Sequence, residues 1–427
     1  MRIKRAFWLT LLAVGMAVLV ALAACAKKKE VKEVRSFKPN IVIVYWAELM
    51  GQLEPSGWGV HRSGGLARLA NYVMHPELFI PKKQVRKMLV IEGGNLFMRR
   101  PPRKEEDIEQ AKALAKFLAE AHRVIGYHPV GVGDIDLYLG HRFLKKLKTE
   151  HGLSLTCANL FSTVENVPLV EPYRIEQVGR KTVAIIGLLG NKSFKLMDRF
   201  HVELPKGYIV QPPKDAFARI YSKLQSQKPQ PDLYLILAHM TKGELKELVP
   251  ILPKNAIVFR SNMTRQRNRV VFINHVPVIE TGRYGRYISK VDVQLTNKTD
   301  PFTEQLNINA IRVEIGRKLK KIDEYKRKAE KASPAQKERL GKVIARMQQR
   351  VDALKAELKK QSWSPNMVRI TLVPMDKTIG DEATVKSMIE KFKAEKEKGS
   401  TAEKVKPRKP RKERIKTITG GGKTKKK

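Results

Sequence analysis

Cysteine, aromatic residues and acidic residues are all scarce in this chain of 427 residues. Its two cysteines cannot supply a disulfide framework, so an ordinary hydrophobic core must stabilise the fold. Aromatic residues make up 7% of the chain and are not interleaved with the basic runs, which argues against a binder of single-stranded nucleic acid. The 42 acidic residues against 84 basic ones leave a net charge of +42, which favours anionic partners.

The N-terminus has the layout of a signal peptide over residues 1–24. Basic residues precede an apolar run over residues 6–24. Leu22-Ala23-Ala24-Cys25 resembles the lipobox of bacterial lipoproteins, and this resemblance implies cleavage before Cys25, lipid on its thiol and a tether over residues 25–38. An uncleaved transmembrane anchor over residues 6–24 is the alternative. Both interpretations predict an exported, membrane-anchored chain of the bacterial cell envelope, on its periplasmic or outer-membrane face.

The anionic partner that we expect is therefore an envelope surface or polymer, bound through the basic C-terminal tail. Nucleic acid is the less favoured partner, because no nucleic-acid-binding module is recognisable in the sequence. The lipid anchor makes the membrane itself a second partner.

Apolar runs alternate with helical patterns over residues 39–300, and consecutive strands follow. Ile41–Trp46 and Met88–Ile91 are continuous apolar runs, which are typical of buried strands. Residues 105–123 repeat apolar side chains at helical spacing, and helices are also expected over residues 215–225 and 242–249. This order predicts a layered α/β sandwich.

The composition changes after residue 300. Apolar side chains at heptad spacing predict an antiparallel helical hairpin over residues 311–361, with Ser333-Pro334 at the start of its second helix. The hairpin either packs within its own chain or docks a protein partner. A short strand-helix segment is expected over residues 362–394, and a disordered basic tail over residues 395–427.

The first strand and the segment after it carry a family resemblance. Ile41 to Pro55, followed by Gly64-Gly65-Leu66, is similar to the opening of a 5′-nucleotidase metallophosphatase domain, of the calcineurin-like group. Five motifs of that family match this chain in order over residues 40–295. The resemblance implies a four-layer α/β/β/α fold for residues 39–300 and, in active members, two cations about 4 Å apart that activate water for phosphate hydrolysis.

The metal-binding positions of those motifs are largely substituted. Glu48 and Met50 stand where the family has aspartate and histidine, and Asn95 replaces the carboxylate that bridges the metals. Asp134 is followed by Ile135 in place of the histidine that stabilises the transition state. The motif candidates for metal ligands are Glu48, Asn95, Asp134, His239 and Asn262. Without a bridging anion two dications would repel strongly, so a dinuclear centre is not expected.

Two hypotheses follow from these substitutions. The chain is a catalytically degenerate envelope protein used for binding or assembly, or it is a divergent phosphoesterase that uses one Mn²⁺, Mg²⁺ or Ca²⁺ ion or altered ligands, with Glu48, Asp134 and His239 as its core. No catalytic residue is assigned under the first hypothesis, in which the candidate positions are polar remnants hydrogen-bonded to one another. The other histidines show no metal-ligand spacing and are expected to be surface or packing residues.

Overall fold

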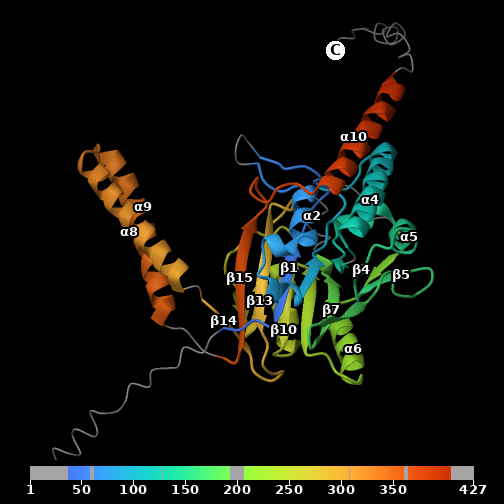
Figure 1. Ribbon diagram of the computed structural model, residues 1–427, viewed down its shortest axis with the longest axis horizontal. Helices are drawn as coiled ribbons and strands as arrows, with labels where there is room; N and C mark the ends of the chain where they lie inside the picture. Colours follow the sequence, from blue (N-terminus) through green and yellow to red (C-terminus); the bar gives the residue numbers. More distant parts are fainter. Residues whose placement is uncertain are drawn as a thin grey trace, which may run out of the picture. The chain divides into compact units, whose positions relative to one another are not determined.

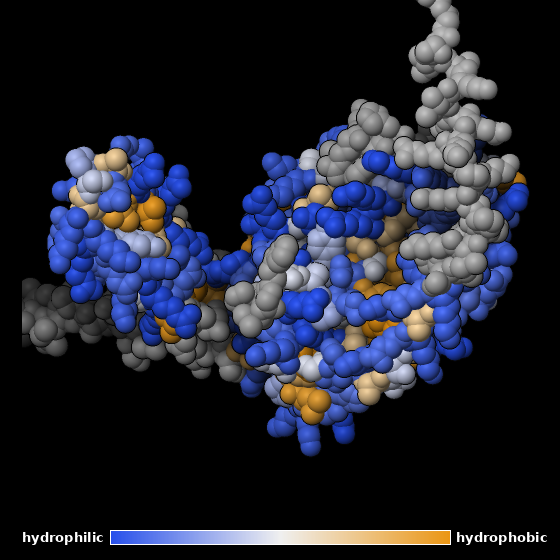
Figure 2. All heavy atoms as spheres, turned by 90° about the horizontal axis from the view of Figure 1, so that it is seen from above, coloured by the Kyte–Doolittle hydropathy of each residue, from blue (hydrophilic) through white to orange (hydrophobic). Residues whose placement is uncertain are grey.

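The computed structural model describes residues 37–57, 62–126, 128–192, 206–306, 308–359 and 364–404. The predicted signal peptide, the predicted lipobox with Cys25 and residues 405–427 of the predicted tail lie outside these ranges. The described residues from Pro39 onward belong to one unit. Among the described helices, none combines the length and apolar composition that a membrane span needs. The face in Figure 2 is mostly hydrophilic, with hydrophobic residues in small patches.

The first of two large sheets has the strand order β14–β15–β13–β1–β2–β3–β4 (Figure 1). Strands β1 to β4 run parallel, and β13 pairs antiparallel with β1. β1 is apolar throughout because both of its faces are buried, Val44 and Trp46 toward the helices and Ile43 and Tyr45 toward the second sheet. The strands are β1 (Ile41–Trp46), β2 (Met88–Glu92), β3 (Val130–Gly131), β4 (Leu155–Thr156), β13 (Tyr287–Gln294), β14 (Phe302–Glu304) and β15 (Asn366–Pro374).

The second sheet has the order β11–β12–β10–β9–β7–β6, and β7, β9, β10 and β12 run parallel. Apolar side chains from both sheets share one core between them. Its strands are β6 (Tyr173–Val178), β7 (Lys181–Leu189), β9 (Leu233–His239), β10 (Ala256–Ser261), β11 (Val271–Ile273) and β12 (Val276–Ile279), and β5 (Leu160–Ser162) pairs separately with β8 (Tyr208–Val210).

Helices cover the outer face of each sheet, which completes the four layers expected from the sequence. The first sheet is covered by α2 (Leu66–Met74), α4 (Glu105–Ile125), α5 (His141–His151) and α10 (Ala383–Lys404), and the second by α6 (Pro213–Gln225) and α7 (Lys242–Leu248). The short helices are η2 (Pro76–Leu78), α3 (Lys82–Val85), η3 (Ile135–Leu139) and η6 (Val249–Ile251).

The expected domain boundary at residue 300 does not coincide with the edge of the first sheet. β15 pairs with β13 along its whole length, from Met367↔Gln294 to Pro374↔Tyr287. α10 adds Val385 and Ile389 to the core over the first sheet, and Phe392 stacks on Phe117 at 4.5 Å between ring centroids. The segment 362–394 therefore completes the sandwich, and the hairpin is an insertion between β14 and β15. α10 also continues to Lys404, nine residues beyond the expected start of the tail at 395.

The predicted hairpin is confirmed. It consists of α8 (Ile308–Glu330) and α9 (Pro334–Lys359), which pack against each other. α9 begins at the expected proline, and the carbonyl of Ser333 accepts a hydrogen bond from the Lys337 N–H at 2.8 Å. Ile322, Val351 and Leu354 are buried along the seam, while Val313 on α8 is 51% exposed.

Candidate functional site

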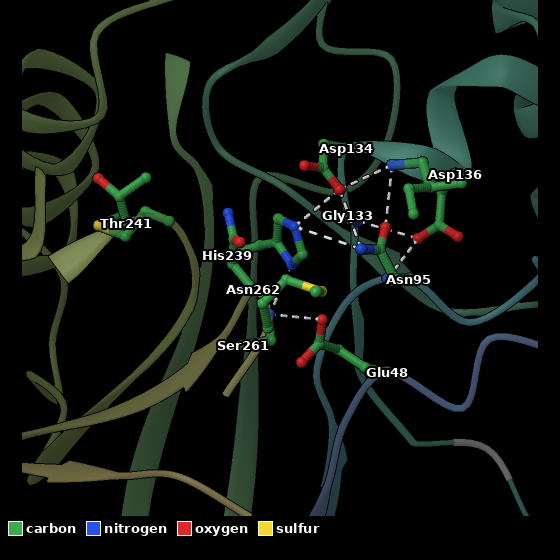
Figure 3. A network of polar contacts seen from close by, with 12 residues as sticks. Glu48, Asn95, Gly133, Asp134, Asp136, His239, Thr241, Ser261 and Asn262 are labelled. Carbon is green, nitrogen blue, oxygen red and sulfur yellow. Dashed lines mark hydrogen bonds and ion pairs between the residues drawn. The ribbon is translucent and has the colours of Figure 1, made fainter. Parts of the chain in front are cut away.

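The five motif candidates come together where the parallel strands of both sheets end. Glu48 and Asn95 follow β1 and β2, and Asp134 follows β3 in the same sheet. His239 is the last residue of β9, and Asn262 follows β10 in the facing sheet. All five are at most 7% exposed, and Figure 3 shows them around one network of polar contacts. The positions taken from the family resemblance therefore lie at one edge of the sandwich, because parallel strands bring their carboxyl ends together there.

The backbone of this site is unusual. Glu48, Asn95 and Asn262 have φ angles of 52°, 62° and 85°, and Met50 and Met263 also have positive φ. Non-glycine residues adopt this left-handed region at a cost, and such residues cluster at binding and active sites. The strand-end loops thus hold a strained, specific shape around the network.

Asp134, Asn95 and His239 form the centre of the network (Figure 3). Nδ2 of Asn95 donates to Oδ1 of Asp134 at 2.9 Å, and Oδ1 of Asn95 accepts from the Ile135 N–H at 2.9 Å. Nε2 of His239 lies 3.0 Å from the same Asp134 oxygen, and its Nδ1 lies 2.8 Å from Oγ of Ser261. These direct contacts occupy the oxygen and nitrogen atoms that would otherwise be free to bind a metal ion.

Asp134 and His239 behave as an ion pair. Burial is the largest single influence and would lower the pKa of His239, but the charge and hydrogen bond of Asp134, together with the charges of Glu48 and Asp136, raise it above its ordinary value. Burial likewise opposes ionisation of Asp134, yet His239 and the hydrogen bonds from Asn95 and Ile135 lower its pKa. An imidazolium thus supplies positive charge beside the carboxylate.

Glu48 is turned toward the loop after β10. Its Oε1 accepts from the Met263 N–H at 2.8 Å, and its Oε2 accepts from the Thr264 N–H at 3.2 Å. Burial raises the pKa of Glu48, against the opposing influence of His239 and of these two hydrogen bonds. Both carboxylate oxygens of Glu48 therefore bind the backbone of the loop after β10 and do not contact Asp134.

Asp136 is a structural residue of the site to which the sequence analysis gave no role. Its carboxylate accepts from the N–H groups of Asn95 at 2.8 Å, Gly133 at 2.9 Å and Phe97 at 3.3 Å. Burial outweighs these contacts and raises the pKa of Asp136 to about 6. The side chain ties the loop after β2 to the loop after β3. Its position two residues after Asp134, within the third motif, was the only signal in the sequence.

Arginines surround an aromatic residue next to Glu48. The Tyr284 N–H donates to the Glu48 carbonyl at 2.8 Å. The guanidinium groups of Arg99 and Arg283 lie 5.5 Å from the Tyr284 ring centroid, and that of Arg286 lies 5.6 Å from it. We call Arg99, Arg283, Tyr284 and Arg286 the arginine rim. It places positive charge beside the site.

Comparison with solved structures bears on the fold. No model of a known protein family matches the sequence, and no curated protein matches it. A 5′-nucleotidase precursor from Thermus thermophilus is 14% identical, with a TM-score of 0.54 over 82% of this chain and 58% of its own. The chain is similar in fold to a 5′-nucleotidase. The Thermus thermophilus sulfate thiohydrolase SoxB, in complex with glycerol, is 13% identical, with a TM-score of 0.51 over 62% of this chain and 55% of its own.

The chain thus spans a little over half the length of these two proteins. At such low identity the likeness shows the fold and not the activity. The chemistry of this 5′-nucleotidase-like chain has to be argued from its own residues.

The residues present do not fit a two-metal centre. Asn95 offers Asp134 an N–H donor where an anionic bridge is needed, and Asn95 cannot carry that charge. Met50 brings a thioether, which binds hard or borderline cations poorly, and Ile135 packs in the apolar core. His239, the remaining imidazole, contacts Asp134 directly. We therefore derive no hydrolytic step through a metal pair.

Cys157 takes no part in this site. Its Sγ lies 3.3 Å from Oδ1 of Asn159, and burial raises the pKa of the thiol to about 12. A buried thiol held in its neutral form is unreactive.

Proposed function

We propose that this chain is a membrane-anchored envelope lipoprotein whose 5′-nucleotidase-like fold is catalytically degenerate and serves in binding or assembly. One observation carries the loss of catalysis. Asn95 and His239 both donate to Oδ1 of Asp134, at 2.9 Å and 3.0 Å, in the place where the family resemblance implies metal ligands. A network that is already complete gains little from a cation and would have to break several hydrogen bonds to admit one.

Positive charge supports binding as the retained activity. The arginine rim lies beside the strand-end site, and the whole chain carries a net charge of +42. Such a field attracts anionic surfaces and depends on ionic strength. We propose an anionic envelope polymer or lipid headgroup as the partner, with the basic tail adding to the attraction and the hairpin available for a protein partner.

A second candidate is a divergent phosphoesterase that uses one divalent cation. It is favoured by the pKa of Asp134, which is lowered and keeps this carboxylate ionised beside His239. Asp134, His239 and Glu48 are the residues that would hold the cation, in agreement with the oxygen-rich donor set that Mg²⁺, Ca²⁺ or Mn²⁺ prefers. The strained loop geometry at Glu48 and Asn95 is compatible with this role.

A substrate panel separates the two candidates. The full-length protein is assayed with nucleoside mono-, di- and triphosphates and an aryl phosphate, in Mg²⁺, Mn²⁺, Ca²⁺ and Zn²⁺. We expect no turnover above the protein-free blank. Cation-dependent turnover that is lost in Asp134→Ala but kept in Asp323→Ala, an exposed acid on α8, would establish the second candidate instead.

Anchoring and binding are tested separately. Mass spectrometry of the N-terminal peptide should find Cys25 as the acylated first residue, whereas retention of residues 1–24 would indicate a transmembrane anchor. Removal of residues 405–427 should weaken binding to anionic vesicles and flatten its dependence on salt. Binding that is equally strong and equally salt-dependent without those residues would contradict the role given to the tail.

A further inference from the structure

A second polar cluster lies in the core between the first sheet and its helices. Glu92 ends β2, His122 lies on α4, and His128 lies in the connection from α4 to β3. Their exposed fractions are 0%, 3% and 6%. Nε2 of His122 and Nε2 of His128 lie 2.8 Å and 3.5 Å from Oε2 of Glu92. Both histidines had been expected to be isolated surface or packing residues, and the fold instead places them on one carboxylate.

The two rings are oriented alike. Nδ1 of His122 lies 2.7 Å from the Leu118 carbonyl oxygen, and Nδ1 of His128 lies 2.9 Å from that of Gly126. A carbonyl oxygen only accepts hydrogen bonds, so Nδ1 carries a proton in both rings. Each neutral ring then presents Nε2 as an acceptor, and both acceptors face a carboxylate, which is an acceptor as well. Three acceptors that converge in this way need a proton or a metal ion between them.

Buried atoms of the cluster also lack partners. Oε1 of Glu92 and Nε2 of His128 have no hydrogen-bond partner within the described ranges of the chain. Buried polar atoms without partners are rare because they are costly. One proton on His122 would satisfy its contact with Glu92 and leave both of these atoms unpaired. A metal ion bound by the two rings and the carboxylate would give Nε2 of His128 and the Glu92 carboxylate a partner.

We propose that Glu92, His122 and His128 form a buried site for one Zn²⁺ ion, distinct from the strand-end site. One ligand atom from each residue lies within 4.8 Å of the others, so small side-chain shifts would bring all three to zinc bond lengths of about 2.0–2.2 Å. The Leu118 and Gly126 carbonyls act as the outer hydrogen-bond partners that fix zinc-binding imidazoles.

The ion would have a structural role. It would fasten the end of β2 to α4 and to the segment leading into β3, beside the Trp46 ring, whose centroid lies 5.0 Å from that of His128. The three ligands are separated by 30 and 6 residues in the sequence, so folding must precede or accompany binding.

Metal content of variants tests the proposal. Full-length protein is stripped with a chelator, incubated with one equivalent of ZnCl₂ and desalted, and zinc per chain is measured. We expect one zinc in the wild type and at least a tenfold loss in His128→Gln and in Glu92→Gln. His75→Gln, which changes an exposed histidine, and Asp134→Ala, in the strand-end site, should keep the full amount. A wild type without zinc, or undiminished zinc in His128→Gln, would overturn the proposal.

A crystallographic measurement on the wild type does not depend on the folding of any variant. Anomalous difference maps recorded at the zinc absorption edge should show one peak bounded by Glu92, His122 and His128. No peak there, or a peak beside Asp134 alone, would refute the site. A peak beside Asp134 would also contradict the proposed loss of catalysis, so the two failures are distinguishable.

Discussion

Replacing Asn95 by aspartate tests whether hydrogen bonds have taken the place of cations in the strand-end site. Nδ2 of Asn95 lies 2.9 Å from Oδ1 of Asp134, so Asn95→Asp sets one carboxylate oxygen against another. Both side chains are buried, which limits screening by solvent. Two unit charges at that separation repel by about 6 kcal/mol at an effective dielectric constant of about 20.

Protonation limits this cost. The folded-state pKa of the new carboxyl is raised, so the penalty grows as the pH rises above the unfolded-state pKa of about 3.9. A carboxyl that stays protonated in the folded state costs about 1 kcal/mol at about pH 4.5 and about 4 kcal/mol at about pH 7. Nε2 of His239 lies 3.5 Å from the substituted atom, and an imidazolium there offsets part of the repulsion. We therefore expect a loss of about 2–4 kcal/mol near neutral pH.

Urea unfolding followed by circular dichroism measures the loss at both pH values. Asn166→Asp, in an exposed loop, is the matched control and should change the free energy of unfolding by no more than about 0.5 kcal/mol. Millimolar Mn²⁺ should not restore Asn95→Asp, because Met50 and Asn262 remain poor or neutral ligands. A loss below about 1 kcal/mol near pH 7, or full recovery in Mn²⁺, would refute the inference that hydrogen bonds already satisfy the polar atoms of this site.

Three further predictions concern the ion pair, the sheet and the hairpin. The pKa of His239 is raised and that of Asp134 is lowered, so the stability that wild type gains over His239→Gln should be greatest between about pH 4 and 6.5. It should fall as the pH rises through the folded pKa of His239 and as it drops through that of Asp134; urea titrations that find a flat difference would contradict the ion pair. A chain that ends at residue 300 lacks β15 and α10, so its circular dichroism spectrum should be that of an unfolded chain. Replacing residues 308–361 by a short Gly-Ser linker should keep the fold. A folded truncated chain would show that β15 is dispensable. Leu354→Ala should destabilise the hairpin by about 2–5 kcal/mol, which hydrogen exchange would detect as faster exchange in α8 and α9. Lys355→Ala, on the exposed side of α9, should have no such effect. Equal effects of the two substitutions would place Leu354 outside the seam between the helices.

Local patterns in the sequence were sufficient for most of the helices and strands, whereas the candidate site residues came from the family resemblance. The continuous apolar run of β1 predicted a strand buried on both faces, and the heptad pattern predicted the hairpin that α8 and α9 form. The order of the strand-end motifs brought Glu48 and Asp134 into one site, because parallel strands present their carboxyl ends together. These inferences succeed because side-chain periodicity is set by strand and helix geometry within a few residues.

Other features depended on which distant segments pack together. β15 reads as an ordinary strand, and nothing local shows that it pairs with β13, more than seventy residues earlier in the chain. The contact of Asp136 with three N–H groups is equally invisible, since it requires the loops after β2 and β3 to lie side by side.

Patterns along the chain predicted the layered α/β fold that the structure has, whereas the missing metal-binding charges of the strand-end site stay a prediction from the family resemblance. Only the tertiary structure decided that the polar atoms of this site satisfy one another, and that His122 and His128 converge on Glu92. The physical reason is that a metal site or a hydrogen-bond network is a matter of angstroms between side chains from separate elements. Residue types and spacing restrict which groups are available, and the packing of helices on sheets sets the distances between them.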